Sequence, residues 1–396
     1  HKFDAIRSTD YYALAGIFRS TEPFMDEARN ATMWWEYDVP QADGTAPVTV
    51  MAPKDSVPRN LRVHLRGNRF TLGKIVPRGA MSVLANVEPS IQCAVDPNQI
   101  TSGRLELAEW VASPGNPLTA RVIVNRVWQQ HFGRGLVATS DNFGTRGEPP
   151  THPQLLDWLT FHFVRKGWNL QWLHRQILLS NTWQQSHLRD AIDTRWLSGF
   201  TRRRLTAEEL RDAMLSVSGQ LDRTPGSSES GEFLYSQAED INSKIRPNRV
   251  GADDPFYTEF RKRSIYLPIV RNMVPDVLTL FDAADPNSVT STRNATTVSL
   301  QSLFLMNHPF VRQQSLSFAD RLLGMTVSDD VRIHEAHRLA LGRPATDVEL
   351  NETNQFLRDY EVEAMNGGAS KMDARRNAWQ SFCQALLCSN EFLYVE

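Results

Sequence analysis

The chain has 396 residues, of which 41% are hydrophobic and 22% are charged, and its formal net charge is -2. These values are ordinary for a globular protein of roughly two or three domains, and the near-neutral balance predicts no nucleic-acid partner and no general attraction to an anionic membrane. No apolar stretch approaches the roughly 18 residues that a membrane-spanning helix needs, so we expect no membrane span in this chain.

Cysteine and histidine spacing argues against a bound cofactor. The cysteines are Cys93, Cys383 and Cys388, an odd number that allows at most one internal disulfide. No Cys-x-x-Cys-His motif occurs, so we expect no haem attachment and no cofactor in this chain. His334 and His337 are three residues apart, but arginines flank them and no third ligand follows at a telling spacing, so we predict no metal site.

The first hundred residues combine helix and strand signals. Residues 1–36 read as a helix that Thr9 and Asp10 cap, and we assign 1–38 to the helical tail of a preceding domain. Residues 39–100 are rich in Pro, Gly and Val, with alternating runs at 48–51 and 61–65, and we assign them to a small β module.

Helix signals dominate the rest of the chain. The sequences Thr206 to Glu209 and Thr346 to Glu349 are capping boxes, and Gly133 predicts a helix end. We assign 101–221 to a helical core domain, 222–262 to a long surface excursion, and 263–396 to a C-terminal helical part that opens with a short strand at 264–267. Helices are predicted over 102–112, 117–132, 153–167, from 169, and over 275–282, 299–306, 308–323, 329–341, 347–363 and 373–388. The predicted fold is therefore mainly α, a multi-helix C-terminal domain with a small β module near residues 40–100.

The helix 117–132 carries the first candidate site. It is apolar nearly all round, which is typical of a buried helix, yet it contains Arg121, Asn125 and Arg126. Arg121, Asn125 and Trp128 share one helical face. One interpretation is a ligand-binding wall for an anion or a sugar, with Trp128 as the stacking platform. The other is a structural network in which a buried arginine pairs with a carboxylate.

The loop 139–153 carries the second candidate site. Asp141 and His152 lie between predicted helices, and Asp157 follows one turn later. An aspartate and a histidine are a possible base and its orienting partner in a hydrolase, so these three residues are the catalytic candidates. Glycines and helix caps in the same loop also allow a purely structural interpretation.

A third candidate lies in the second half of the chain. Arg263 precedes the predicted short strand, and Arg293 precedes a predicted helix. Both are predicted to meet Asp282 and Asp285, either as a salt-bridge network or as a bidentate site for an acidic ligand such as a sulfated or uronic glycan.

Several short segments form a recognisable set. They are 105–110, 116–128, 132–137, 142–144, 147, 150–153, 155–159, 167–168, 204–205, 208, 211–212, 281–282 and 389–395. Together they resemble the planctomycete-specific C-terminal domain of unknown function fifteen fifty-three, found in large proteins that often carry a cytochrome c domain. The N-terminal stretch 2–18 resembles the end of its companion domain, fifteen forty-nine.

The resemblance implies an exported protein, located in the periplasm, secreted or on the cell surface, although no signal peptide is present in this chain. It also implies that any haem-bearing domain lies upstream of His1. It implies no reaction.

Three functions remain open at this point. The first is a non-catalytic binding or scaffold module for a polysaccharide or a partner domain. The second is a hydrolase that acts on polysaccharides, sulfated ones included. The third is a docking partner for a c-type cytochrome domain in electron transfer.

Overall fold

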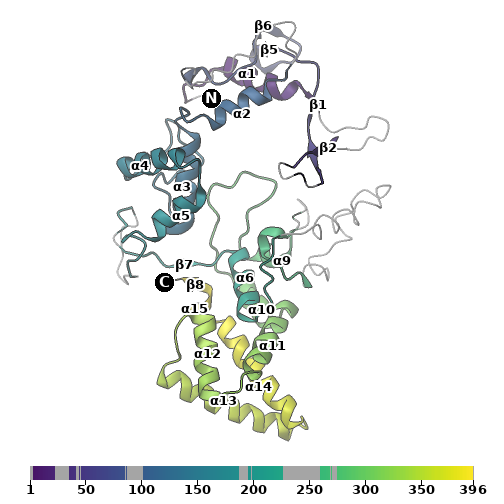
Figure 1. Cartoon of the computed structure of the whole chain (residues 1–396), viewed down its shortest axis with the longest axis vertical. Coiled ribbons are helices and arrows are strands. Elements are labelled where there is room, and N and C mark those ends of the chain that lie inside the picture. Colours follow the sequence, from purple (N-terminus) through teal and green to yellow (C-terminus); the bar gives the residue numbers. More distant parts are fainter. Residues whose placement is uncertain are drawn as a thin grey trace. The chain divides into compact units, whose positions relative to one another are not determined.

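The structure is a computed structural model, and it confirms a mainly helical protein with small two-stranded antiparallel sheets (Figure 1). It describes residues 3–22, 35–41, 44, 46–84, 86, 101–186, 195–197, 199–225, 259–267, 269 and 274–395.

The chain divides into two compact units. Unit 1 comprises His1–Gln185 and Ala191–Gly199, and unit 2 comprises Ser186–Asp190 and Phe200–Glu396. The division falls inside the stretch 101–221 that we predicted as one domain. Its physical reason is packing, because the helix that follows residue 206 shares a hydrophobic core with the C-terminal helices and not with the helices before it.

In its described residues, the N-terminal part of unit 1 consists of one helix and three small sheets. Helix α1 (Ser8–Arg19) is followed by the pairs β1 (Thr21–Glu22) with β4 (Lys54–Asp55), β2 (Trp35–Val39) with β3 (Val48–Ala52), and β5 (Leu61–His64) with β6 (Leu72–Val76). Short 3-10 turns, η1 (Leu65–Gly67) and η2 (Ser82–Leu84), complete this part.

The strands predicted at 48–51 and 61–65 are therefore confirmed, but the helix predicted over 1–36 is wrong beyond residue 19. Residues 35–39 form a strand because β2 pairs along its full length with the β-branched strand β3. Residues 23–34 of that prediction lie outside the described part of the chain.

Four helices form the second part of unit 1. They are α2 (Arg104–Ala112), α3 (Thr119–Phe132), α4 (Pro153–Arg165) and α5 (Leu170–Leu178). Local signals set their ends, as predicted. Gly133 ends α3 with a φ of 78°, Pro153 opens α4, and the Asn169 side chain accepts a hydrogen bond from the Trp172 N–H at the start of α5.

Unit 2 follows the predicted helices closely. The helices in its described residues are α6 (Ala207–Val217), α9 (Asp276–Leu280), α10 (Ser299–Asn307), α11 (Pro309–Leu323), α12 (Asp329–Leu341), α13 (Asp347–Asn366), α14 (Lys371–Leu387) and α15 (Asn390–Leu393). Strands β7 (Arg203–Arg204) and β8 (Tyr394–Val395) pair antiparallel.

Both predicted capping boxes form, and an arginine three residues before each box also binds its glutamate. The Thr206 N–H donates to Glu209 Oε2 at 2.8 Å, and the Thr346 N–H donates to Glu349 Oε2 at 2.7 Å. Arg203 and Arg343 then bind the same two glutamates with pairs of hydrogen bonds of 2.7–2.9 Å. The glutamate of each capping box thus binds both the start of its own helix and an arginine that precedes the helix.

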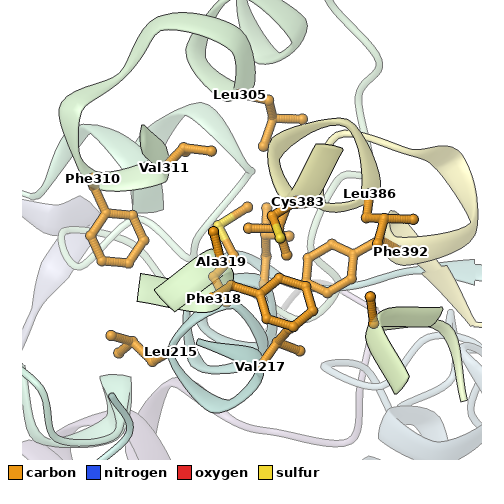
Figure 2. Packing of buried hydrophobic residues seen from close by; sticks show 14 of the residues in the cluster. Leu215, Val217, Leu305, Phe310, Val311, Phe318, Ala319, Cys383, Leu386 and Phe392 are labelled. Carbon is orange, nitrogen blue, oxygen red and sulfur yellow. The ribbon is translucent and has the colours of Figure 1, made fainter. Parts of the chain in front are cut away.

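The core of unit 2 lies mainly between α11, α14 and α6. Figure 2 shows Phe318 and Ala319 of α11 packed near Cys383 of α14 and Val217 of α6. Trp379 of α14 is fully buried in the same cluster. Burial of such large side chains provides most of the driving force for folding this unit.

The short strand predicted at 264–267 is wrong, because η3 (Ser264–Tyr266) is a 3-10 turn. Side chains of α6 bind its backbone and so replace a strand partner. Asp212 accepts hydrogen bonds from the N–H and the hydroxyl of Ser264, both at 2.7 Å. Arg211 donates to the carbonyls of Phe260 and Lys262.

Arg211 is the most deeply buried arginine among the described residues of unit 2, with 1% of its surface exposed. Burial lowers the pKa of its guanidinium to about 10, so the group stays charged at neutral pH. Its charge is balanced by carbonyl oxygens and by Asp212, whose carboxylate lies 3.8 Å away.

The two ends of the predicted excursion 222–262 meet. The Asp222 N–H donates to the Arg261 carbonyl at 3.0 Å, and Lys262 Nζ donates to Asp222 Oδ2 at 3.0 Å and to Thr224 Oγ1 at 2.7 Å. Hydrogen bonds from Thr224, with a smaller contribution from Lys262, lower the pKa of Asp222 to about 2. Residues 226–258 lie outside the described part of the chain.

Within the described residues, no helix is both long enough and apolar enough to cross a membrane.

We predict that Arg211→Ala destabilises unit 2 by about 3 kcal/mol, because several buried oxygen acceptors lose their donor. Arg338→Ala, which removes an exposed arginine that pairs with Glu335 one helical turn away, is the matched control and should change stability by less than about 0.5 kcal/mol. Urea unfolding of both variants measures the difference, and equal effects would contradict the structural role of Arg211.

We also predict that the stabilisation from Asp222 depends on pH. Its folded pKa is about 2, below the unfolded value of about 3.9, so its contribution is complete above about pH 4 and is lost as the pH falls toward 2. The stability difference between the wild type and Asp222→Asn should therefore be smaller at pH 3 than at pH 6. Asp141→Asn, at an exposed position, serves as the control.

Candidate functional site

Arg121 and Asp157 are the predicted site residues that the structure brings together. Arg121 Nε and Nη2 donate to Asp157 Oδ1 at 2.9 and 2.6 Å, and Nη1 donates to the Pro117 carbonyl at 2.8 Å. The two side chains remain 35% and 58% exposed. The pair is therefore partly exposed, whereas the sequence suggested a buried one, and such a pair contributes about 0–1 kcal/mol to stability.

Asn125 has a structural role. It is fully buried, its Nδ2 donates to the Val137 carbonyl at 2.9 Å, and its Oδ1 accepts from the Val137 N–H at 2.8 Å. Gly135 packs so closely that an added Cβ would lie 2.7 Å from Asn125 Nδ2. The predicted ligand-binding role of Asn125 is thus replaced by a clamp that holds the segment after α3.

The side chains of Trp128 and Arg126 lie on opposite sides of α3. Trp128 is only 4% exposed and stacks on Phe132, with ring centroids 4.3 Å apart. Arg126 is exposed on the other side of α3. The interpretation of Trp128 as a stacking platform for a sugar is therefore corrected, because the apolar face of α3 that carries it lies in the core.

The loop 139–153 binds the N-terminal segment of the same unit. Thr145 donates its N–H and its hydroxyl to Asp4 Oδ1, both at 2.9 Å, and these bonds lower the pKa of Asp4. The Arg146 guanidinium lies 3.9 Å from the centroid of the Phe3 ring. This loop therefore holds the helical part of unit 1 to residues that precede α1.

The three catalytic candidates have separate surroundings. Asp141 is exposed, His152 Nδ1 lies 3.0 Å from the Thr151 hydroxyl and its ring contacts Trp196, and Asp157 pairs with Arg121. In the described part of the chain, no hydrogen bond joins any two of the three candidates.

The described residues also contain no group of three or more metal-ligating side chains.

The arginines of the third candidate site have partners other than those predicted. Arg263 Nε lies 3.6 Å from Asp212, and Arg293 Nη1 lies 2.6 Å from Glu208. The predicted pairing of these arginines with Asp282 and Asp285 is wrong, because α6 supplies both carboxylates through the tertiary fold.

Asp282 instead forms a half-buried network that sequence reasoning missed. Arg204 Nη2 donates to Asp282 Oδ2 at 2.6 Å, and the Thr296 N–H donates to the same oxygen at 2.8 Å. Burial raises the pKa of Asp282, but the hydrogen bonds from Arg204 and Thr296 outweigh burial and hold the pKa below its usual value. Asp282 has a φ of 62°, a conformation that this network keeps in place.

The outer side of α4 carries aromatic residues in a row. Trp158, Phe161, His162 and Arg165 are spaced i, i+3, i+4 and i+7, which places them on one face of the helix. Trp158 is 49% exposed and Phe161 is 56% exposed, although polar residues usually occupy the outer face of a packed helix.

Helix α5 adds Trp172 to this row. Its ring centroid lies 6.3 Å from Trp158 and 6.2 Å from His162, and the Trp158 and His162 centroids lie 4.5 Å apart. The Arg165 guanidinium lies 5.4 Å from the Phe161 centroid. We call the surface formed by these five residues the aromatic face.

The candidate sites predicted from the sequence include none of the five members of the aromatic face. The signal was present, because the apolar residues of helix 153–165 are too many for its buried side alone. The exposed positions of a helix become evident only when its packed side is known.

Comparison with known protein families assigns the chain to a family. Residues 103–357, well over half of the chain, match PSD1, described as protein of unknown function (DUF1553). The chain belongs to this family. The match includes the aromatic face. It does not include residues 2–18, whose resemblance to a companion domain stays a prediction.

No curated protein and no solved structure matches the chain.

We predict that Asn125→Ala destabilises unit 1 by about 2 kcal/mol, because the buried N–H and carbonyl of Val137 lose their partners. Gln130→Ala, at an exposed position of the same helix, is the matched control and should be nearly neutral. Thermal unfolding of the two variants provides the measurement. A similar loss in both would mean that helix propensity, and not the clamp, sets the effect.

Proposed function

We propose that this chain is a non-catalytic binding module that holds a polysaccharide on the aromatic face of unit 1. The observation that carries this proposal is the half-exposed state of Trp158 and Phe161, side by side on one face of α4. Large contiguous apolar surfaces on a protein usually mark a binding site.

The chemistry of the face suits a sugar polymer. The flat faces of Trp158 and Phe161 offer apolar area to the C–H faces of sugar rings. His162 and Arg165, on the same helical face, supply hydrogen-bonding groups for the hydroxyls around those rings. Apolar area with a few convergent polar groups is the usual composition of a ligand site.

The dimensions of the face also suit an extended ligand. Trp158 and Arg165 are seven residues apart, which corresponds to about 10 Å along the helix axis. Trp172 widens the face on the α5 side. A polymer chain that runs along α4 would contact several of these residues at once, and such multiple contacts raise affinity without a deep pocket.

The non-catalytic character is supported by the surroundings of the acid and base candidates. General acid–base chemistry requires a base within hydrogen-bond reach of its orienting group or of the reacting proton. Asp157, the candidate nearest to the aromatic face in sequence, accepts two hydrogen bonds from Arg121. A hydrolase that uses Asp141, His152 or Asp157 stays an alternative prediction.

The setting of this module is proposed from the family resemblance. Within this proposal, the module acts outside the cytoplasm as part of a larger protein. Docking of a c-type cytochrome domain is the alternative use of the same apolar surface.

Isothermal titration of the purified chain with a panel of soluble polysaccharides tests the proposal. Trp158→Ala and Phe161→Ala should each weaken binding about tenfold, which corresponds to about 1.4 kcal/mol. Phe70→Ala is the matched control, because Phe70 is also in unit 1, is 80% exposed and lies beside an arginine, but is not part of the aromatic face.

Binding that Trp158→Ala leaves unchanged would reject the aromatic face as the site. If no polysaccharide binds but a cytochrome c binds in a manner sensitive to Trp158→Ala, the docking alternative replaces the proposal. Release of shortened sugar products, lost in Asp141→Asn, would establish the hydrolase instead.

A further inference from the structure

The two helices that form the aromatic face carry an excess of positive charge. Residues 153–180 contain three basic side chains, Arg165, Lys166 and Arg175, and a single acidic one, Asp157. With histidines neutral, this segment has a charge of +2, whereas the whole chain has a charge of -2. The excess arises because the segment has few carboxylates, whereas its share of basic residues matches that of the whole chain.

The positive groups are available to a ligand. Arg165, Lys166 and Arg175 are all exposed, and none of them forms an ion pair with another described residue. The one carboxylate of the segment, that of Asp157, is already bound by Arg121. Among the described residues, no carboxylate therefore neutralises these three basic side chains.

We infer that the polysaccharide held by the aromatic face is anionic, with carboxylate or sulfate groups that Arg165 binds while Trp158 and Phe161 contact its sugar rings. This inference rests on the proposed function of the same face. It names the chemical class of the ligand and assigns the anion-binding role to Arg165.

Arg165 has the geometry for this role. It follows Phe161 by one helical turn, and its guanidinium lies 5.4 Å from the centroid of that ring. A guanidinium presents a planar fork of donors that matches the paired oxygens of a carboxylate or a sulfate. An anionic group on a sugar that contacts Phe161 would therefore lie within reach of this fork.

Three of the arginines that the sequence suggested for a ligand are less suitable. Arg121, Arg263 and Arg293 each face a carboxylate of the protein itself, at 2.6, 3.6 and 2.6 Å. An external anion would have to displace that carboxylate, whereas Arg165 requires no such exchange.

Helix polarity alone explains only part of this arrangement. Arg165 and Arg175 lie in the last turns of α4 and α5, where a positive charge interacts favourably with the helix dipole. That interaction accounts for basic residues at these ends, but it does not require exposed aromatic rings beside them. A role in helix stability and a role in ligand binding can be separated by measuring the fold and the binding affinity of the same Arg165 variants.

The test compares three polymers with one backbone: dextran, carboxymethyl dextran and dextran sulfate. Isothermal titration with the full chain should show at least tenfold tighter binding of one or both charged forms than of dextran. The advantage should shrink as NaCl is raised to about 1 M, where the screening length falls to about 3 Å. The two charged polymers distinguish a carboxylate-binding site from a sulfate-binding site.

Variants assign the effect to Arg165. Arg165→Gln should remove most of the advantage of the charged polymer, and Arg165→Lys should retain part of it. Arg69→Gln is the matched control, because Arg69 of the same unit also lies over an exposed phenylalanine ring, at 4.6 Å from its centroid. Circular dichroism of each variant confirms that the fold is kept.

The outcomes separate this inference from the proposed function. Equal binding of all three polymers, lost in Trp158→Ala, would overturn the anionic ligand and leave the polysaccharide site in place. An equal loss in Arg69→Gln and Arg165→Gln would also overturn it, because general charge would then explain the binding. No binding to any of the three would overturn the inference, and the wider panel would then decide on the proposed function.

Discussion

Burial of one side of α4 determines which of its side chains are exposed to a ligand on the other side. Leu156, Leu159 and Phe163 pack with α3 and α5 and are at most 3% exposed. Because a helix has a period of 3.6 residues, this packing turns Trp158 and Phe161 outward. The aromatic face, and with it the proposed binding function, depends on this one packing constraint.

Polar residues that look functional in the sequence mostly serve the fold. Asn125 clamps Val137, Asp282 binds Arg204, and Arg211 satisfies buried carbonyls. Each arrangement follows from the high free-energy cost of a buried polar group without a partner. Arg165 differs from these residues, because it forms no ion pair with another described residue and lies beside the exposed rings of the aromatic face.

The structural ion pairs and the proposed binding face lie mostly in different units. Unit 2 contains the larger core, in which α11 and α14 pack with α6, and a set of arginine–carboxylate pairs that connect α14 to α11, α12 and α13. Unit 1 contains the aromatic face and the loop that binds residues before α1. In the proposal, unit 1 therefore holds the ligand.

The sequence by itself determined the fold class, the limits of most helices and the family. Capping boxes at Thr206 and Thr346 and the helix stop at Gly133 act within three or four residues, so a local pattern is sufficient to predict them. The tertiary structure decided which charges pair, as with Arg293 and Glu208, which are 85 residues apart in the chain. It also decided which aromatic rings face outward and that 264–266 is a turn, because these outcomes depend on contacts between distant segments that no local pattern encodes.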